Sequence, residues 1–227
     1  MNKVAKLIWI MALFSPATWV FAGDYQGLLV EANKHLETFK SHEQAQAITN
    51  IAGAAKAVVI IPDQVAASLI VGYKRGTGAM FRRHGTQWSD PVFMTFVEYS
   101  IGTQLGGSSN AVIVLILTNK VVDGIVEGVN HIGTGGGFAL GSLGLGSTGG
   151  GSLGGGLEML SVSTRAGLQV GGAVGDTKIY PAEEFNAAAY GDDFDIEKIL
   201  STPGGKLAAA NMLRESLELA TRNSYEK

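Results

Sequence analysis

Apolar residues recur at three- and four-residue steps between positions 24 and 41, with charged residues between them. This pattern is typical of an amphipathic helix with one buried face. A second helix is expected over 42–55, where alanines and isoleucines again share a face. The buried positions predicted for the first helix are Leu28, Leu29, Ala32, Leu36 and Phe39.

The period of the pattern then changes, and a β-rich region follows. The apolar run AVVII before Pro62 predicts a short buried strand. Later runs rich in Val, Ile, Phe and Tyr predict further strands. The sequence HGTQ at 84–87 is a candidate hairpin turn, and Asn119 is expected to cap a short helix. The predicted strands cover 57–61, 66–72, 78–83, 91–101 and 110–118.

Glycine dominates residues 133–156, where 13 of 24 positions are glycine. Fixing so many glycines costs a large backbone entropy, so we expect a mobile loop or a weakly held pair of strands. Residues 157–163 and 168–174 are expected to form a hairpin around the sequence TRAG.

The C-terminal part returns to helical patterns. Pro181 opens a predicted helix and Gly191 closes it, in the usual order of proline first and glycine last. The sequence STPGG at 201–205 predicts a linker, and a final helix is expected over 207–220. The whole pattern predicts an α+β fold, with N-terminal helices, an antiparallel β-rich central core with a Gly-rich loop, and C-terminal helices.

Residues 1–22 have the pattern of a secretory signal peptide. Two lysines precede a short apolar stretch, and Val20 and Ala22 are the small residues expected before a cut at Gly23. The stretch is too short to cross the ~30 Å hydrocarbon core as a helix. We therefore expect a periplasmic or secreted protein, with a signal peptide (1–22), one domain (23–200) and a C-terminal helical extension (201–227).

Composition excludes several classes of protein. Hydrophobic residues make up 46% of the chain, which is enough for a core and rules out disorder of the whole chain. The chain has no cysteine, which excludes thiolate zinc sites and disulfides. A formal net charge of -3 argues against a general nucleic-acid-binding protein.

Two glycine motifs resemble those of enzymes but lack the necessary context. GLGSTG at 144–149 fits a dinucleotide fingerprint, yet further glycines follow where a helix must begin. GGSLG at 150–154 fits a hydrolase nucleophile elbow, yet the last histidine, His131, lies upstream of it. Both matches are expected by chance in a glycine-rich segment.

The candidate metal ligands are also poorly arranged. The four histidines have no metal-ligand spacing, and Asp192, Asp193 and Asp195 lack the alternating oxygen donors of a calcium loop. No combination of nucleophile, base and oxyanion site is evident in the sequence. We therefore expect a protein that is not an enzyme and that holds no metal or cofactor.

A series of short motifs is more specific than any of these. Each places glycine, proline or a polar residue at a fixed point beside an apolar strand. They are AKAVVIIP at 55–62, a glycine-bearing turn at 72–78, QWSDP at 87–91, GTQLGG at 102–107, LTN at 117–119, SVSTRAGL at 161–168, and Asn186 with Tyr190 and Gly191. In order and spacing, residues 28–191 resemble the SYLF domain, a lipid-binding family whose fungal members are also called actin-binding.

The resemblance implies phospholipid binding without catalysis, especially to anionic or phosphoinositide head groups. The chain departs from the family pattern at Val162, where a tyrosine is usual, and at Ala166 and Gln169. Actin is not expected as a partner, because an exported chain does not meet it. A specific protein partner is not identifiable from the sequence.

Basic residues are concentrated in one short region, and we expect them to bind the lipid head group. Residues 56–83 carry five lysines and arginines against one acid. The alternative is a solvated hairpin edge, where basic residues discourage edge pairing. A second functional interpretation is a structural or envelope-interaction protein that uses its Gly-rich loop and terminal helices. The expected lipid-binding residues are Lys56, Lys74, Arg75, Arg82, Arg83 and His84.

Overall fold

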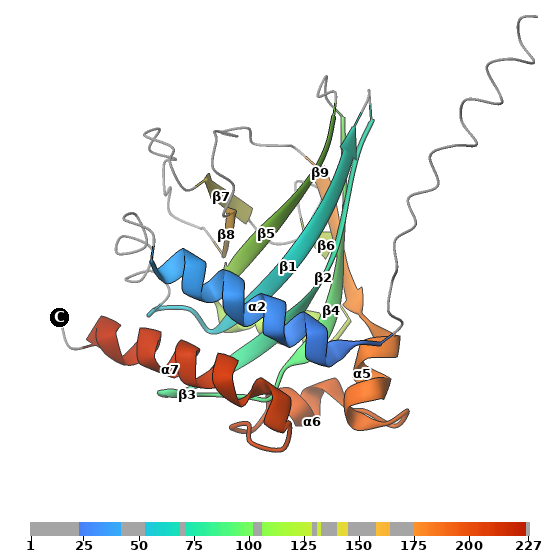
Figure 1. The fold of residues 1–227 in the computed structure, drawn as a ribbon. Coiled ribbons are helices and arrows are strands. Elements are labelled where there is room, and N and C mark those ends of the chain that lie inside the picture. The colour runs from blue at the N-terminus through green and yellow to red at the C-terminus, as the bar shows by residue number, and fades with distance from the viewer. Residues whose placement is uncertain are drawn as a thin grey trace, which may run out of the picture.

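A computed structural model gives the fold (Figure 1). It describes residues 23–41, 53–68, 71–101, 106–128, 131–132, 140–144, 158–163 and 175–225. A single mainly antiparallel sheet forms the centre, an N-terminal helix and a C-terminal helix lie across one face, and further helices follow the later strands. The predicted α+β class is therefore confirmed.

The described residues form a nine-stranded sheet in the order β6-β9-β4-β2-β1-β5-β8-β7, with β3 paired to β2. All pairs are antiparallel except β7 with β8, which is parallel. The strands are β1 (Ala57–Ser68), β2 (Val71–His84), β3 (Gln87–Trp88), β4 (Val92–Ile101), β5 (Gly106–Ile116), β6 (His131–Ile132), β7 (Leu140–Gly144), β8 (Met159–Ser163) and β9 (Gly175–Pro181).

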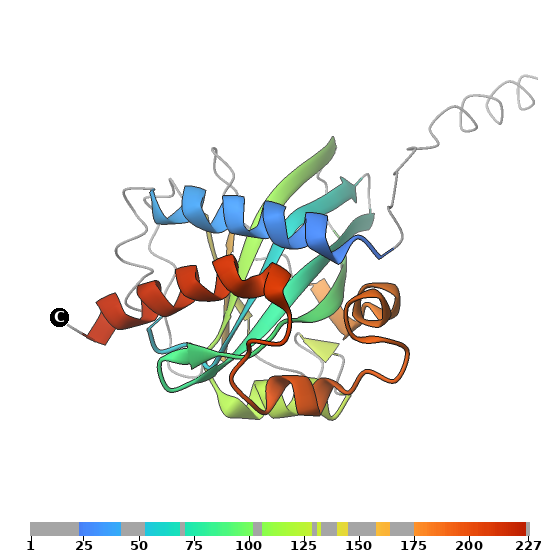
Figure 2. The same cartoon turned by 60° about the horizontal axis from the view of Figure 1, so that its bottom comes forward.

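The helices are α2 (Tyr25–Lys40), α4 (Asn119–Val126), α5 (Glu183–Tyr190), α6 (Ile196–Leu200), the 3₁₀ turn η2 (Ala208–Ala210) and α7 (Asn211–Tyr225). Figure 2 shows α2 in blue and α7 in red, side by side across the sheet. Hydrogen bonds join them from the Ser216 hydroxyl to a carboxylate oxygen of Glu37 (2.8 Å) and from the Asn33 amide to the Met212 sulfur (3.4 Å).

Both faces of the sheet are buried where helices cover them. Successive side chains of a strand point to opposite faces, so each strand contributes to two cores. On the face that we call the α2/α7 face, Phe81 and Phe93 pack with Leu36 and Leu213. On the opposite face, the α4/α6 face, residues such as Met80 pack among apolar residues of α4 and α6. This double burial explains the uninterrupted apolar run of β1.

The first hairpin of the sheet differs from the sequence prediction. Strands were expected at 57–61 and 66–72, with a glycine-bearing turn at 72–78, but β1 continues through Pro62 and β2 includes the whole glycine segment. A register shift between Ile60 and Gln64 adds one residue to β1, which is a β-bulge. The prediction was wrong because a proline is tolerated at such an irregularity.

The glycines of β2 allow β1 to approach closely at this bulge. A Cβ atom on Gly78 would lie 2.7 Å from the carbonyl oxygen of Ile60 and 2.7 Å from a side-chain carbon of Ile61. Real Cβ atoms essentially never come so close to a backbone atom. Gly78 is therefore required by packing between strands and not by a turn.

Several other predictions are confirmed by the structure. α2 begins after Asp24, whose carboxylate accepts a hydrogen bond from the Gly27 amide, and it ends at Lys40. The strand expected over 91–101, the turn at 84–87 and the helix closed by Gly191 all occur. The start predicted for that helix is wrong, because Pro181 is the last residue of β9 and α5 begins at Glu183. Thr118, rather than Asn119, caps α4.

Other expectations are corrected or fall outside the described residues. Most of the helix predicted over 42–55 lies outside them, and positions 53–54 form a turn. The glycine-rich segment 133–156 is described only at 140–144, which forms β7, and 164–174 lies outside the description. β9 and α6 were missed, because GDTK has little strand propensity and α6 has only five residues.

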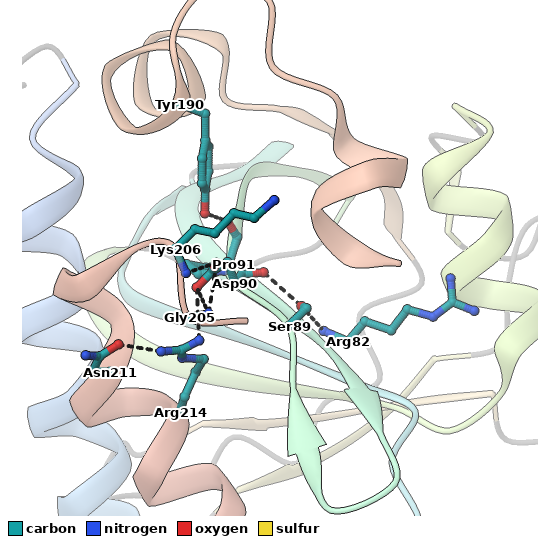
Figure 3. Close-up of polar contacts among 9 residues, drawn as sticks. All are labelled: Arg82, Ser89, Asp90, Pro91, Tyr190, Gly205, Lys206, Asn211 and Arg214. Atoms are coloured by element: carbon teal, nitrogen blue, oxygen red, sulfur yellow. Dashed lines mark hydrogen bonds and ion pairs between the residues drawn. The ribbon is translucent and has the colours of Figure 1, made fainter. Parts of the chain in front are cut away.

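A buried carboxylate fixes the C-terminal segment to the sheet. The Asp90 side chain accepts hydrogen bonds from the backbone amides of Gly205 (3.1 Å) and Lys206 (2.8 Å), and it pairs with the Arg214 guanidinium at 3.1 Å (Figure 3). The Asp90 and Arg214 side chains are only 6% and 11% exposed. The predicted linker therefore docks on the connection between β3 and β4, and α7 begins from a fixed position.

Neighbouring contacts extend this joint. The Gly204 amide donates to the Trp88 carbonyl at 2.8 Å, and the Trp88 indole donates to the Thr221 hydroxyl on α7 at 3.2 Å. The Tyr190 hydroxyl donates to the Pro91 carbonyl at 2.5 Å. Burial, together with the nearby Asp90 charge, raises the pKa of Tyr190 far above its usual range, so the hydroxyl stays a donor.

We predict that Asp90→Asn lowers the free energy of unfolding by about 3 kcal/mol, because the buried Arg214 cation loses its partner. Asp123→Asn is the matched control, since Asp123 pairs with Arg82 at 3.0 Å but is 51% exposed. That change should cost less than about 1 kcal/mol. Urea unfolding measures both values, and equal losses in the two variants would contradict the role given to Asp90.

We predict that Gly78→Ala destabilises the fold by about 1–3 kcal/mol, because its methyl group must displace β1 at the bulge. Arg75→Ala, at an exposed position of the same strand, should change stability by less than about 0.5 kcal/mol. Thermal and urea unfolding of both variants tests this. A Gly78→Ala protein as stable as the parent would show that β1 does not pack against β2 as described.

Candidate functional site

The basic residues predicted to bind lipid lie on or beside one strand. β2 carries five of them, from Lys74 to His84, and Lys56 precedes β1. Lys74 and Arg82 are eight residues apart, which corresponds to roughly 26 Å along a strand. The six residues therefore form two groups at opposite ends of β2 and not a single cluster.

Strand alternation divides these residues again between the two faces. Lys74, Arg82 and His84 share the α4/α6 face, whereas Arg75 and Arg83 lie on the α2/α7 face. The charge that is concentrated in the sequence is thus dispersed in space.

The group at the lower end of β2 in Figure 1 is engaged in contacts that hold the fold together. Arg82 pairs with Asp123 of α4, and the Arg83 guanidinium donates to the carbonyl of Gly53 before β1. The His84 Nε2 atom lies 2.9 Å from the carbonyl of Leu200 at the end of α6. These side chains connect β2 to three neighbouring segments.

The group at the upper end is closer to solvent. Lys74 pairs with Glu98 across the β2–β4 ladder at 2.8 Å. Arg75 is exposed, and no ion pair involving it occurs among the described residues. Lys56 is half-buried. Arg75 is therefore the predicted residue whose charge is best placed to meet an external anion.

Arg75 lies on a part of the sheet that extends past the helical layer. Figure 1 shows β1, β2 and β5 continuing beyond α2 toward the top of the view. We call this part of the α2/α7 face the distal sheet face. Its described side chains are Val65, Tyr73, Arg75, Thr77, Thr95, Val97, Lys178 and Tyr180.

Sequence reasoning missed several members of this face. Lys178 and Tyr180 belong to β9, which pairs with β4 although the paired positions are at least 75 residues apart in the chain. Val65 lay outside the predicted strands and Tyr73 in the predicted turn at 72–78, but β1 and β2 include them. The pairs Tyr73–Arg75 on β2 and Lys178–Tyr180 on β9 are seen to share one face only once the strand pairing is known.

Some of the motif residues that suggested a family hold elements of the fold together. The Asn186 side chain accepts from the Phe93 amide (2.9 Å) and donates to the Phe93 carbonyl (2.7 Å), so it binds α5 to β4. Trp88 and Asp90 of the QWSDP motif hold the C-terminal segment. These residues stabilise the fold and do not identify a ligand site.

Within the described parts of the chain, no group of three His, Asp or Glu side chains is arranged to hold a metal ion. The same parts contain no helix with the length and apolar character needed to cross a bilayer.

Comparison with known proteins identifies a family. The family model Ysc84, described as "Las17-binding protein actin regulator", matches residues 97–220, which is more than half of the chain and runs from β4 into α7. The search of curated proteins found no match, and neither did the search of solved structures. The chain therefore belongs to the Ysc84 (SYLF) domain family, a family associated with lipid binding.

Proposed function

We propose that this chain is an exported, non-catalytic protein that binds anionic phospholipids at a membrane surface. Family membership supports the lipid as the class of ligand. The observation that carries the proposal is the exposed Arg75 on a sheet end that projects past the helices. A guanidinium can donate two parallel hydrogen bonds to a phosphate, which gives both affinity and geometry.

The proposed head-group site comprises residues of unequal importance. Arg75 and Lys74 at the upper end of β2 provide the main attraction, although Glu98 partly neutralises Lys74. The remaining members contribute more weakly through their charge, because they already bind protein groups or are half-buried; they are Lys56, Arg82, Arg83 and His84. Each basic residue near an anionic membrane adds about 1 kcal/mol of attraction.

Export is part of the proposal. The first 22 residues have the sequence pattern of a secretory signal peptide, and α2 begins directly after Asp24. The family description names Las17 binding and actin regulation, and we do not extend either to this chain, because an exported protein does not meet cytoplasmic actin.

A protein-binding role is the second candidate function, and one observation favours it. Val30 on α2 and Met212 and Leu219 on α7 are exposed on the outer side of the helical layer. A partner that covered this surface would bury all three. This candidate is preferred if the mature chain fails to bind vesicles and Met212→Glu releases a protein that co-purifies with it.

We predict that the mature protein co-sediments with vesicles containing phosphatidylglycerol and not with neutral phosphatidylcholine vesicles. Arg75→Glu should lower the affinity for anionic vesicles about thirtyfold, because it replaces one attractive charge by a repulsive one at about 1 kcal/mol each. Added salt should weaken binding by the parent.

Lys34→Glu is the matched control for Arg75→Glu. It makes the same charge change on the exposed side of α2, where Lys34 pairs with Glu31. Binding by this control should stay within about threefold of the parent, because its charge lies more than a Debye length from the membrane. Equal losses in the two variants would mean that net charge alone governs binding, and the assignment of Arg75 would be wrong.

We predict that export and cleavage yield a mature protein that begins at Gly23. Expression with the native N-terminus, followed by N-terminal sequencing of the exported protein, measures this directly. Mature protein that retains Met1 would refute both the cleavage and the proposed export route.

A further inference from the structure

We infer that the distal sheet face enters the membrane interface, with Tyr73, Tyr180 and Val65 among the lipid head groups and Arg75 and Lys178 at the phosphates. This inference rests on the proposed function and specifies which surface meets the lipid and how the molecule is oriented. The upper ends of β1 and β2 then point toward the bilayer, and α2 and α7, which cover the lower part of the same face, lie farther from it.

The backbone register places these residues on one surface. Lys178 of β9 pairs with Val97 of β4, Val97 with Arg75 of β2, and Arg75 with Val65 of β1. Paired residues point to the same face, and neighbouring strands lie about 4.8 Å apart. The row therefore crosses four central strands, with a cation, an apolar residue, a cation and an apolar residue in turn.

Two tyrosines lie on either side of this row. Tyr73 is two residues from Arg75 along β2, and Tyr180 is two residues from Lys178 along β9, so both share the face of the row. The Thr77 and Thr95 hydroxyls, 3.3 Å apart, form the next row toward the helices. The face thus combines aromatic, aliphatic, cationic and hydroxyl side chains.

Three apolar side chains of this face are open to solvent, whereas Val97 and Thr95 between them are buried, at 4% and 3% exposed. Val65 is 48% exposed, Tyr73 38% and Tyr180 39%. The same face is closed below by α2 and α7, where Phe81 and Phe93 are fully buried. Tyrosine has an apolar ring and a polar hydroxyl, and this combination is enriched where membranes meet water.

The charge of the face suits an anionic interface. Arg75 and Lys178 form no ion pair among the described residues, and their long stems can lie along apolar surface while the charged ends reach phosphate. Glu98 belongs to the opposite face with Lys74.

A lipid surface fits these features better than a protein occupant. Strands β4, β2 and β1 are internal to the sheet, so their backbone groups are already paired and an added strand has no edge to join along them. The outer side of β9 is paired with β6 at Thr177 and Lys178. A second copy docked face to face would bring Arg75 and Lys178 close to the same cations of its partner. Anionic head groups neutralise both cations and leave room for the tyrosine rings.

Tryptophan fluorescence provides the test. Trp88 is the only tryptophan beyond residue 22, and it is buried, so an introduced tryptophan can be read against a constant background. Tyr73→Trp carries the reporter on the distal sheet face, and Met212→Trp carries it on the helical layer as the matched control. Each mature protein is mixed with phosphatidylglycerol vesicles that contain dibrominated acyl chains, which quench nearby indole rings.

We expect a blue shift and strong quenching for Tyr73→Trp and little change for Met212→Trp. In a second measurement, Tyr180→Ser should weaken vesicle binding about fivefold even in 1 M salt, because at a Debye length of about 3 Å the apolar contribution remains while charge is screened. Val30→Ser, on α2, should leave binding unchanged.

The outcomes separate this inference from the proposed function. If the protein binds anionic vesicles but Tyr73→Trp is no more quenched than Met212→Trp, the orientation is wrong and lipid binding stands. If the parent binds no vesicles, both ideas fail. A lipid-free blue shift of Tyr73→Trp that grows with protein concentration would show that a second copy covers the face, which would overturn the inference.

Discussion

The buried carboxylate of Asp90 determines how the two ends of the chain meet on the sheet. It accepts from two consecutive backbone amides of the C-terminal segment and pairs with Arg214 at the first turns of α7. A buried charge is stable only when it is fully paired, so this geometry tolerates little displacement. The start of α7 is thereby fixed, and α7 in turn packs beside α2.

The position of the helical layer decides which part of the sheet stays open. α2 and α7 cover the lower half of one face, and β1, β2 and β5 continue past them. Gly78 contributes to this length, because the close approach of β1 lets both strands run on through the bulge. The end of the sheet thus stays exposed because the contacts of Asp90 hold α7 over the lower part of the face.

Local patterns predicted the elements that depend on local chemistry. The periodicity of α2, the apolar run of β4 and the glycine that closes α5 were sufficient, whereas Pro181 ends β9 and does not open the helix. The continuation of the strand at 57–61 through Pro62 into the rest of β1 was not predictable from local patterns, because a proline within an apolar run is usually a strand end. β9 has a weak strand signal of its own and is a strand because β4 provides its partner.

In the candidate site, too, some residues could be predicted from the sequence and others only from the strand pairing. Composition identified the basic residues of β2, but only strand pairing shows that Arg82, Arg83 and His84 bind neighbouring protein groups while Arg75 faces solvent. Tyr180 and Lys178 became candidates through their register with β4, which no sequence period encodes. The residues near the helices therefore serve mainly the fold, and those at the open end are available for a ligand.

The most direct test of this account is the depth of a nitroxide spin label at Val65 in the presence of anionic vesicles. The chain has no cysteine, so Val65→Cys accepts a single label, and Leu219→Cys on α7 is the corresponding control. We predict that power saturation shows the label at 65 to be more accessible to oxygen than to a water-soluble nickel complex, while the label at 219 stays accessible to nickel. A label at 65 that remains as accessible to nickel as the label at 219, on vesicle-bound protein, would contradict the account.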